Sequence, residues 1–273
     1  MTADAGDPSL ATARSGPERS RPLPDAPPLQ IVRSALFNLL FWLWTGLMVL
    51  AALPLAPFVT PQGMREVARF WMRGTQLLLR RVVGLDYEVR GLERLPPGPC
   101  IVASKHQSAW ETLFFHLVRP DLVIGLKYEL TLIPLFGWYL MRARNIRIDR
   151  GGAATALRSL LRGAEDAVAA GWSILIFPEG TRKDPGEPPD YKPGVAALYL
   201  ELGVPVVPVA LNSGLFWARR SFVKRPGRIT VEFLEPIAPG LDRRQFMVEL
   251  ERRIEGATRR LLAGSAPGTE ETA

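Results

Sequence analysis

The sequence predicts an α/β fold in which a mixed, largely parallel sheet is flanked by helices and preceded by an N-terminal membrane-binding helical segment. Two patterns predict this class. After Gly84, short apolar runs rich in β-branched residues alternate with segments of helical periodicity, as expected for strands joined by crossover helices. Before Gly84, a long uncharged apolar segment precedes a basic amphipathic one, as expected for helices that bind a bilayer.

The chain begins with a segment that is predicted to be a disordered tail. Residues 1–32 are rich in Pro, Ser, Asp and Ala and contain almost no large apolar side chains, so they cannot bury enough surface to fold. A signal peptide is not predicted, because the apolar run starts only near Ala35 and no convincing cleavage site follows it. At the other end, residues 264–273 are predicted to be a second disordered tail.

Residues 33–83 are predicted to be membrane-anchoring helices. No charged residue occurs between Arg33 and Arg65, a length sufficient for a bilayer span of roughly 20 residues, although Pro54 and Pro57 interrupt it. From residue 64 to residue 83, apolar residues recur at helical spacing, and the arginines between them are expected to face lipid phosphate: Arg65, Arg69, Arg73, Arg80 and Arg81. The alternative is a pair of core helices that caps a soluble domain.

A single catalytic domain is predicted over residues 84–263. One of its helices ends at Gly171, and another has proline in its first turn and ends at Gly203. The expected strands span residues 85–90, 100–104, 122–125, 173–177, 204–211 and 228–234. The expected helices span residues 110–118, 153–170, 193–202 and 242–262. In this architecture, the loops at the carboxyl ends of the strands are the natural place for a site.

Composition narrows the choice of ligands. The 34 Lys and Arg residues exceed the 27 Asp and Glu residues, so the net charge of +7 favours anions: nucleic acid, phospholipid headgroups or a phosphorylated substrate. Nucleic acid is not expected as a partner, because the arginines are dispersed and no recognised zinc-finger or RNA-binding motif occurs. The single Cys100 cannot form an intramolecular disulfide, which suits a reducing compartment. Neither a metal site nor a bound cofactor is predicted.

An imidazole and a carboxylate follow the second predicted strand. His106 and Glu111 are five positions apart, so their side chains can meet only if His106 lies on a turn and Glu111 lies in the first turn of the next helix. In that arrangement, the carboxylate accepts the proton of one ring nitrogen and raises the basicity of the other. His106 would then take a proton from a hydroxyl that attacks a carbonyl. The alternative is a surface or capping histidine.

Four segments of the chain form an ordered set of motifs. Residues 105–111 read K-H-Q-S-A-W-E, residues 177–182 read F-P-E-G-T-R, and residues 204–209 read V-P-V-V-P-V. In their order and spacing over residues 30–262 they resemble the motifs of glycerolipid acyltransferases of the lysophosphatidic acid acyltransferase type. The segment from 145 to 150 matches the remaining family motif only partly. The chain also departs from the family pattern by having Glu111 where Asp is usual and Lys105 where Asn is usual.

The resemblance implies an acyltransferase domain over residues 84–263 with the family's fold. It implies transfer of a fatty acyl group from acyl-CoA or acyl carrier protein to the sn-2 hydroxyl of lysophosphatidic acid, which gives phosphatidic acid. His106 would be the general base and Glu111 its orienting partner, without an acyl-enzyme. The expected location is a lipid bilayer, at the cytoplasmic face of a bacterial inner membrane. The alternatives are an acyltransferase for another lysolipid, such as a lyso-ornithine lipid, and a non-enzymatic membrane-binding protein.

The substrate phosphate is expected to bind to cations near the motifs. Arg182 is the first candidate, because a guanidinium binds phosphate with two parallel hydrogen bonds, and Lys127 and Arg150 are the next. Gly180 would let the backbone approach the ligand, and the amides from Glu179 to Thr181 would bind anionic oxygen. The alternatives are that Glu179 only braces its loop and that Arg150 forms a structural ion pair.

For His116 and for residues 216–225, the sequence pattern indicates a role less specifically. His116 is expected on a helix surface and not to act as a second base. A basic and aromatic cluster at residues 216–225 is either a second contact with anionic lipid or an ordinary solvated loop: Phe216, Trp217, Arg219, Arg220, Phe222, Lys224 and Arg225.

Overall fold

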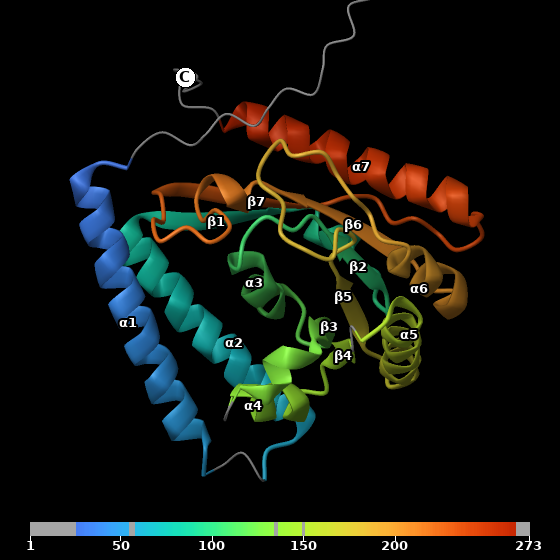
Figure 1. Ribbon diagram of the computed structural model, residues 1–273, viewed down its shortest axis with the longest axis horizontal. Coiled ribbons are helices and arrows are strands. Elements are labelled where there is room, and N and C mark those ends of the chain that lie inside the picture. Colours follow the sequence, from blue (N-terminus) through green and yellow to red (C-terminus); the bar gives the residue numbers. More distant parts are fainter. Residues whose placement is uncertain (1–25, 55–57, 134–135, 149–150, 266–273) are drawn as a thin grey trace, which may run out of the picture.

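The computed structural model describes residues 26–54, 58–133, 136–148 and 151–265 (Figure 1). Within them, a seven-stranded sheet has the order β1-β7-β6-β2-β5-β3-β4. All neighbouring strands are parallel except β6 and β7, which confirms the mixed, largely parallel sheet. The strands are β1 (Leu85–Arg90), β2 (Ile101–Ser104), β3 (Leu122–Lys127), β4 (Ile146–Ile148), β5 (Ser173–Ile176), β6 (Val206–Leu211) and β7 (Gly227–Phe233).

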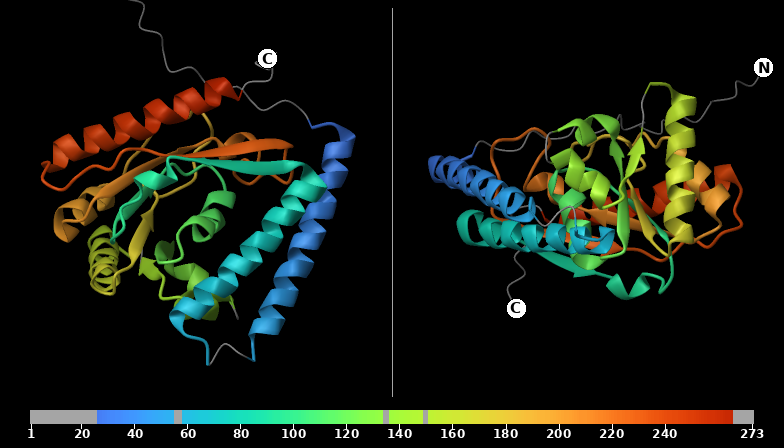
Figure 2. Two further views of the ribbon diagram at one scale, coloured as in Figure 1. Left: turned by 180° about the vertical axis from the view of Figure 1, so that it is seen from behind. Right: turned by 90° about the horizontal axis from the view of Figure 1, so that it is seen from below.

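Helices cover both faces of this sheet (Figures 1 and 2). They are α1 (Pro28–Ala52), α2 (Pro61–Leu78), α3 (Trp110–Val118), α4 (Phe136–Arg142), α5 (Ala153–Ala169), α6 (Gly194–Leu202) and α7 (Arg243–Gly264). Successive side chains of β2 point to opposite faces. Ile101 and Ala103 lie in the core formed with α5, α6 and α7, whereas Val102 lies in the core formed with α1, α2 and α3. The central strand is therefore buried on both faces.

Most elements lie close to the ranges that the sequence predicts. The long closing helix α7 begins after Asp242, whose side chain and that of Gln245 form a reciprocal capping box. The short elements β4 and α4 have no counterpart among the predicted strands and helices. A three-residue strand has too few positions to show an alternating pattern, and α4 is only seven residues long.

The first helix, α1, begins at Pro28, so residues 28–32 are helical and the predicted tail is too long at that end. Residues 1–25 and 266–273, which contain the rest of the two predicted tails, lie outside the described residues. The helix is long and apolar enough to cross a membrane, and little of it is buried. Its exposed apolar side chains include Leu36, Leu39, Trp42, Leu43, Leu47 and Leu50.

The second helix, α2, belongs to the core, so the prediction that all its arginines face lipid is wrong for Arg65. This side chain is only 3% exposed and donates hydrogen bonds to the carbonyl oxygens of Pro120 (3.1 Å) and Ala143 (3.2 Å). Its guanidinium also lies over the ring of Trp172. Met72 of the same helix is buried in the main core. The alternative of a core helix therefore holds for α2.

The loop at residues 216–225 binds α1 through Lys224. The Lys224 ammonium donates to Asn38 Oδ1 at 2.8 Å and lies over the ring of Trp217. Ser34 lies about one helical turn before Asn38 on the same face of α1, and Gln30 lies about one turn before Ser34. Both side chains donate to the Lys224 carbonyl oxygen. Burial lowers the pKa of Lys224 to about 8. Lys224 is buried against α1 and is therefore not available to lipid headgroups. For this residue, the predicted lipid contact and the predicted solvated loop are both wrong.

Candidate active site

The turn between β2 and α3 brings His106 and Glu111 together. His106 lies on the turn and Glu111 lies in the first turn of α3, as the five-residue spacing requires. His106 Nδ1 is 3.0 Å from Glu111 Oε1. Because this bond uses Nδ1, Nε2 is the ring nitrogen available to a ligand.

Glu111 is fully buried and is surrounded by hydrogen-bond donors. Its Oε1 atom accepts the backbone N–H groups of Gln107 (2.7 Å) and Ser108 (2.6 Å), and its Oε2 atom accepts the Ser213 hydroxyl at 2.8 Å. A carboxylate at the N-terminus of α3 also interacts favourably with the helix dipole. These contacts fix the side-chain orientation. Ser213 was not singled out from the sequence, because it lies 102 residues further along the chain.

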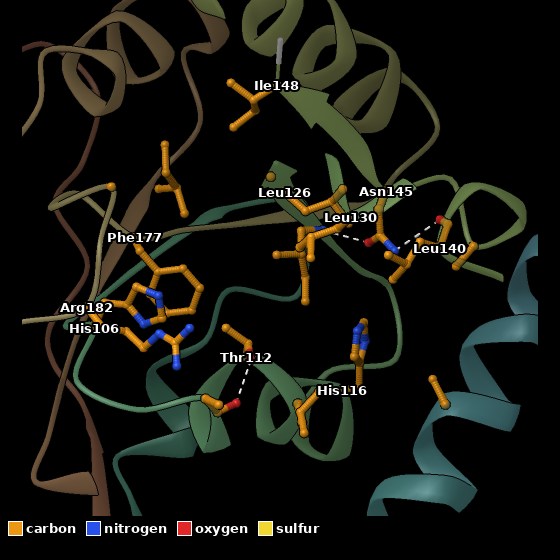
Figure 3. A pocket seen from close by; sticks show the side chains of 18 of the residues that line it. His106, Thr112, His116, Leu126, Leu130, Leu140, Asn145, Ile148, Phe177 and Arg182 are labelled. Atoms are coloured by element: carbon orange, nitrogen blue, oxygen red, sulfur yellow. Dashed lines mark hydrogen bonds between the residues drawn. The ribbon is translucent and has the colours of Figure 1, made fainter. Parts of the chain in front are cut away.

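One face of the His106 ring packs against the loop from Phe177 to Arg182. The rings of His106 and Phe177 stack with their centroids 4.0 Å apart. Figure 3 shows Arg182 and His106 among the side chains that line one cavity. The β2–α3 turn and the 177–182 loop follow the adjacent parallel strands β2 and β5, so topology brings the two motifs to one edge of the sheet.

Glu179 binds protein donors with both carboxylate oxygens. Its Oε1 atom accepts from Lys105 Nζ at 2.7 Å, and its Oε2 atom accepts the backbone N–H of His106 at 3.1 Å. Burial raises the pKa of Glu179, against the opposing effects of Lys105 and the His106 amide. This geometry favours the alternative in which Glu179 braces the loop over a direct contact with substrate.

The same loop turns at Gly180, whose φ of +62° lies in the left-handed region that favours glycine. The Gly180 N–H donates to the Phe177 carbonyl oxygen at 2.9 Å, so this amide serves the turn and is not directed to an anion. Thr181 and Arg182 line the adjacent cavity. The Arg182 carbonyl oxygen accepts from Arg219 Nη1 at 2.9 Å, which joins the 216–225 loop to this motif.

The other two predicted phosphate ligands are Lys127 and Arg150. Lys127 is the last residue of β3, which runs parallel to β5, so it lies at the sheet edge that carries the 177–182 loop. Arg150 lies outside the described residues. Three further cations line the cavity near Arg182 and were not among the predicted phosphate ligands: Lys192, Arg219 and Arg220.

A cavity of about 1200 Å³ is lined by His106 and Arg182 (Figure 3) and extends to residues of α1, α2 and α4. Away from the cationic end, its lining is mainly apolar and includes Met48, Val49, Met64, Leu113, Leu126 and Tyr139. Within the described residues, no group of His, Cys, Asp and Glu could hold a metal ion. The cavity thus combines a cationic end beside an imidazole with a long apolar part, which fits an amphiphile with an anionic headgroup.

His116 also lines this cavity, which corrects its predicted place on the helix surface (Figure 3). Burial, together with the positive charges of Arg65 and Arg69, lowers the pKa of His116 to about 4. Its imidazole is therefore neutral at physiological pH. With this lowered pKa, His116 is a weaker base than an ordinary histidine.

Comparison with known proteins agrees with these features. The acyltransferase family model matches residues 86–212. A 1-acyl-sn-glycerol-3-phosphate acyltransferase of Pseudomonas aeruginosa is 36% identical over 243 residues, covering 88% of this chain and 93% of that protein. The beta enzyme of the same name from Homo sapiens is 31% identical over 157 residues, 56% of each chain.

A solved structure shows the same fold. It is the crystal structure of the 1-acyl-sn-glycerophosphate (LPA) acyltransferase PlsC from Thermotoga maritima, with a TM-score of 0.72 and 20% identity. The match covers 86% of this chain and 98% of that one. From the extent of the match to the Pseudomonas protein, the chain belongs to the acyltransferase family and is an acyltransferase.

Proposed function

We propose that this enzyme transfers a fatty acyl group from acyl-CoA or acyl carrier protein to the sn-2 hydroxyl of 1-acylglycerol 3-phosphate, which gives phosphatidic acid. The observation that carries this proposal is the His106–Glu111 pair, held at 3.0 Å at the cationic end of a largely apolar cavity. An imidazole paired in this way suits proton abstraction, and the cavity suits a phosphate with an acyl chain. The relatives from Pseudomonas aeruginosa and Homo sapiens, both 1-acyl-sn-glycerol-3-phosphate acyltransferases by name, support the same acceptor.

In the proposed reaction, His106 Nε2 removes the proton of the sn-2 hydroxyl as that oxygen attacks the thioester carbon. The new C–O bond forms, the C–S bond breaks, and the imidazolium returns the proton to the leaving thiolate. Glu111 stabilises the imidazolium that forms between these steps. No acyl-enzyme is needed. Cys100, the single cysteine, is fully buried in the core, where burial raises the pKa of its thiol.

Arg182 is proposed to bind the acceptor phosphate. Arg182→Ala is expected to raise the KM for 1-acylglycerol 3-phosphate roughly 10- to 100-fold, because a hydrogen bond between charged groups contributes about 1.5–3 kcal/mol and 1.4 kcal/mol is tenfold. The KM for 1-acylglycerol, which lacks the phosphate, should not change. Steady-state kinetics with both acceptors measures the difference. The matched control is Arg252→Ala, which removes an exposed arginine of α7. An unchanged KM for the phosphorylated acceptor in Arg182→Ala would exclude this contact.

The exposed apolar face of α1 is proposed to lie in the bilayer, at the cytoplasmic face of the inner membrane, where acyl-CoA and acyl carrier protein occur. Deleting residues 1–83 is not a clean test, because Met72, Leu79 and Val83 are core residues. Surface substitutions avoid this difficulty. Trp42, Leu43 and Leu47 are 69%, 61% and 59% exposed, so their replacement should leave the fold intact.

The triple serine variant at Trp42, Leu43 and Leu47 is expected to bind anionic vesicles at least tenfold more weakly, since burial of each large apolar side chain contributes about 1.5–3 kcal/mol. Vesicle co-sedimentation measures the affinity. The control replaces Leu200 and Val248 by serine, because they are exposed apolar residues on the distant helices α6 and α7. Equal binding of the triple variant and the wild type would remove α1 from the membrane contact.

A further inference from the structure

Lys105 lies immediately before His106, at the position where the family pattern has asparagine, and its side chain is almost completely buried. Its Nζ atom is 2.7 Å from Glu179 Oε1 and 2.8 Å from Glu255 Oε1. The hydroxyl of Tyr191 also donates to Glu255 Oε1, at 2.9 Å. The β2–α3 turn, the 177–182 loop, the segment before α6 and the closing helix α7 therefore meet in one buried cluster.

One member of this cluster, Glu179, forms a hydrogen bond with the backbone of His106. Glu179 uses one oxygen for Lys105 and the other for the His106 N–H. The His106 carbonyl oxygen accepts the backbone N–H of Lys183, which follows the 177–182 loop, at 2.8 Å. Both backbone polar groups of His106 are thus held by Glu179 and Lys183, and Lys105 links the 177–182 loop to Glu255 of α7.

The energetics of buried charges make the cluster sensitive to the loss of one member. Removal of one partner from a buried ion pair typically costs about 3–5 kcal/mol, because an uncompensated charge remains. Without Lys105, the carboxylates of Glu179 and Glu255 would face each other without a cation. A neutral, shorter asparagine cannot compensate two carboxylates, so the usual family residue would not fit beside Glu255.

We propose that Lys105 is a positioning residue, which uses its ion pairs with Glu179 and Glu255 to tie the His106 turn and the 177–182 loop to α7. The proposal rests on the proposed function, in which His106 is the base. It adds that, in this chain, the closing helix takes part in placing that base. Lys105 acts through Glu179 and does not touch the substrate.

The central test compares Lys105→Asn, Glu255→Gln and the double variant. Lys105→Asn is expected to lower kcat at least tenfold with less than a threefold change in the KM for the acceptor, because the base is displaced while Arg182 is still held through the Arg219 contact to its carbonyl oxygen. Glu255→Gln should also lower kcat, because it weakens the link to α7, and the double variant should lose less than the sum of the two single losses on a logarithmic scale. A double variant whose loss equals the sum of the two single losses would overturn the coupling to α7.

A readout independent of turnover separates this proposal from the proposed function. The chain has two histidines, His106 and His116, so histidine NMR gives two imidazole signals, which the His106→Ala variant assigns. The His106 signal should shift in Lys105→Asn and should remain shifted in the double variant, which also lacks the link to α7. An unmoved signal would refute the positioning role, whether or not His106 is the base. A shifted signal with wild-type kcat, in an enzyme that His106→Ala inactivates, would also refute it.

Two control variants distinguish a loss of positioning from a loss of folding. Lys105→Arg keeps the cation and is expected to retain the fold and more activity than Lys105→Asn, so it reports on the charge if the asparagine variant does not fold. Equal activity of the two folded variants would contradict the proposal. Arg252→Gln breaks an ion pair with Glu249 on the exposed side of α7 and should leave kcat and the His106 signal unchanged. Thermal unfolding confirms that every variant compared is folded.

Discussion

His106→Ala is expected to lower kcat roughly 10²- to 10⁴-fold, the usual contribution of a general base. The acceptor hydroxyl would then lose the group that takes its proton, whereas the cations near Arg182 would still bind the phosphate. The KM for 1-acylglycerol 3-phosphate should therefore change much less than kcat. Initial rates of phosphatidic acid formation from an acyl-CoA and this acceptor measure both constants.

The fold should tolerate this substitution. Glu111 keeps its hydrogen bonds from Gln107, Ser108 and Ser213 when the imidazole is removed, so the turn retains its main internal contacts. Circular dichroism and vesicle co-sedimentation should be those of the wild type. His106→Asn, which keeps a polar side chain but no base, should be equally inactive. Turnover within threefold of the wild type in either variant would exclude His106 as the base.

Local sequence patterns predicted much of the fold because the central strands are buried on both faces. Runs such as Ile101–Ser104 and Val206–Leu211 contain only buried residues, which gives uninterrupted apolar stretches. The helix from Trp110 to Val118 and the strand from Leu85 to Arg90 occupy the predicted ranges. The spacing of His106 and Glu111 also predicted their geometry, because a turn followed by one helical turn is a local arrangement.

Long-range contacts could not be predicted in this way. An amphipathic helix rich in arginine suggests a headgroup layer, yet Arg65 is buried because Pro120, Ala143 and Trp172 provide partners that are distant in the sequence. Glu255 is similarly far from Lys105, at a separation of 150 residues. No periodicity or motif connects such residues. They become neighbours only after the sheet order has placed α2 and α7.

Glu111→Gln should separate the charge of this residue from its hydrogen bonds. If the glutamine oxygen occupies the Oε1 position, it can still accept from His106, Gln107 and Ser108, and its NH₂ group can donate to the Ser213 hydroxyl. The orientation of the imidazole is then retained while the negative charge is lost. We expect kcat to fall roughly 10²- to 10⁴-fold, because the imidazolium formed during proton transfer is no longer stabilised.

Glu111→Asp tests the length of the side chain instead of its charge. It introduces the usual family residue, which keeps the carboxylate and is shorter by one methylene. The carboxylate of an aspartate cannot keep both the His106 contact and the Ser213 contact at their present lengths of 3.0 Å and 2.8 Å without a shift of α3. We expect a loss of about tenfold in kcat, from one weakened hydrogen bond of about 1.4 kcal/mol. The predicted order of kcat is therefore wild type, Glu111→Asp, then Glu111→Gln. A folded Glu111→Gln variant that is faster than Glu111→Asp would show that the length of the side chain, and not its charge, determines how His106 acts.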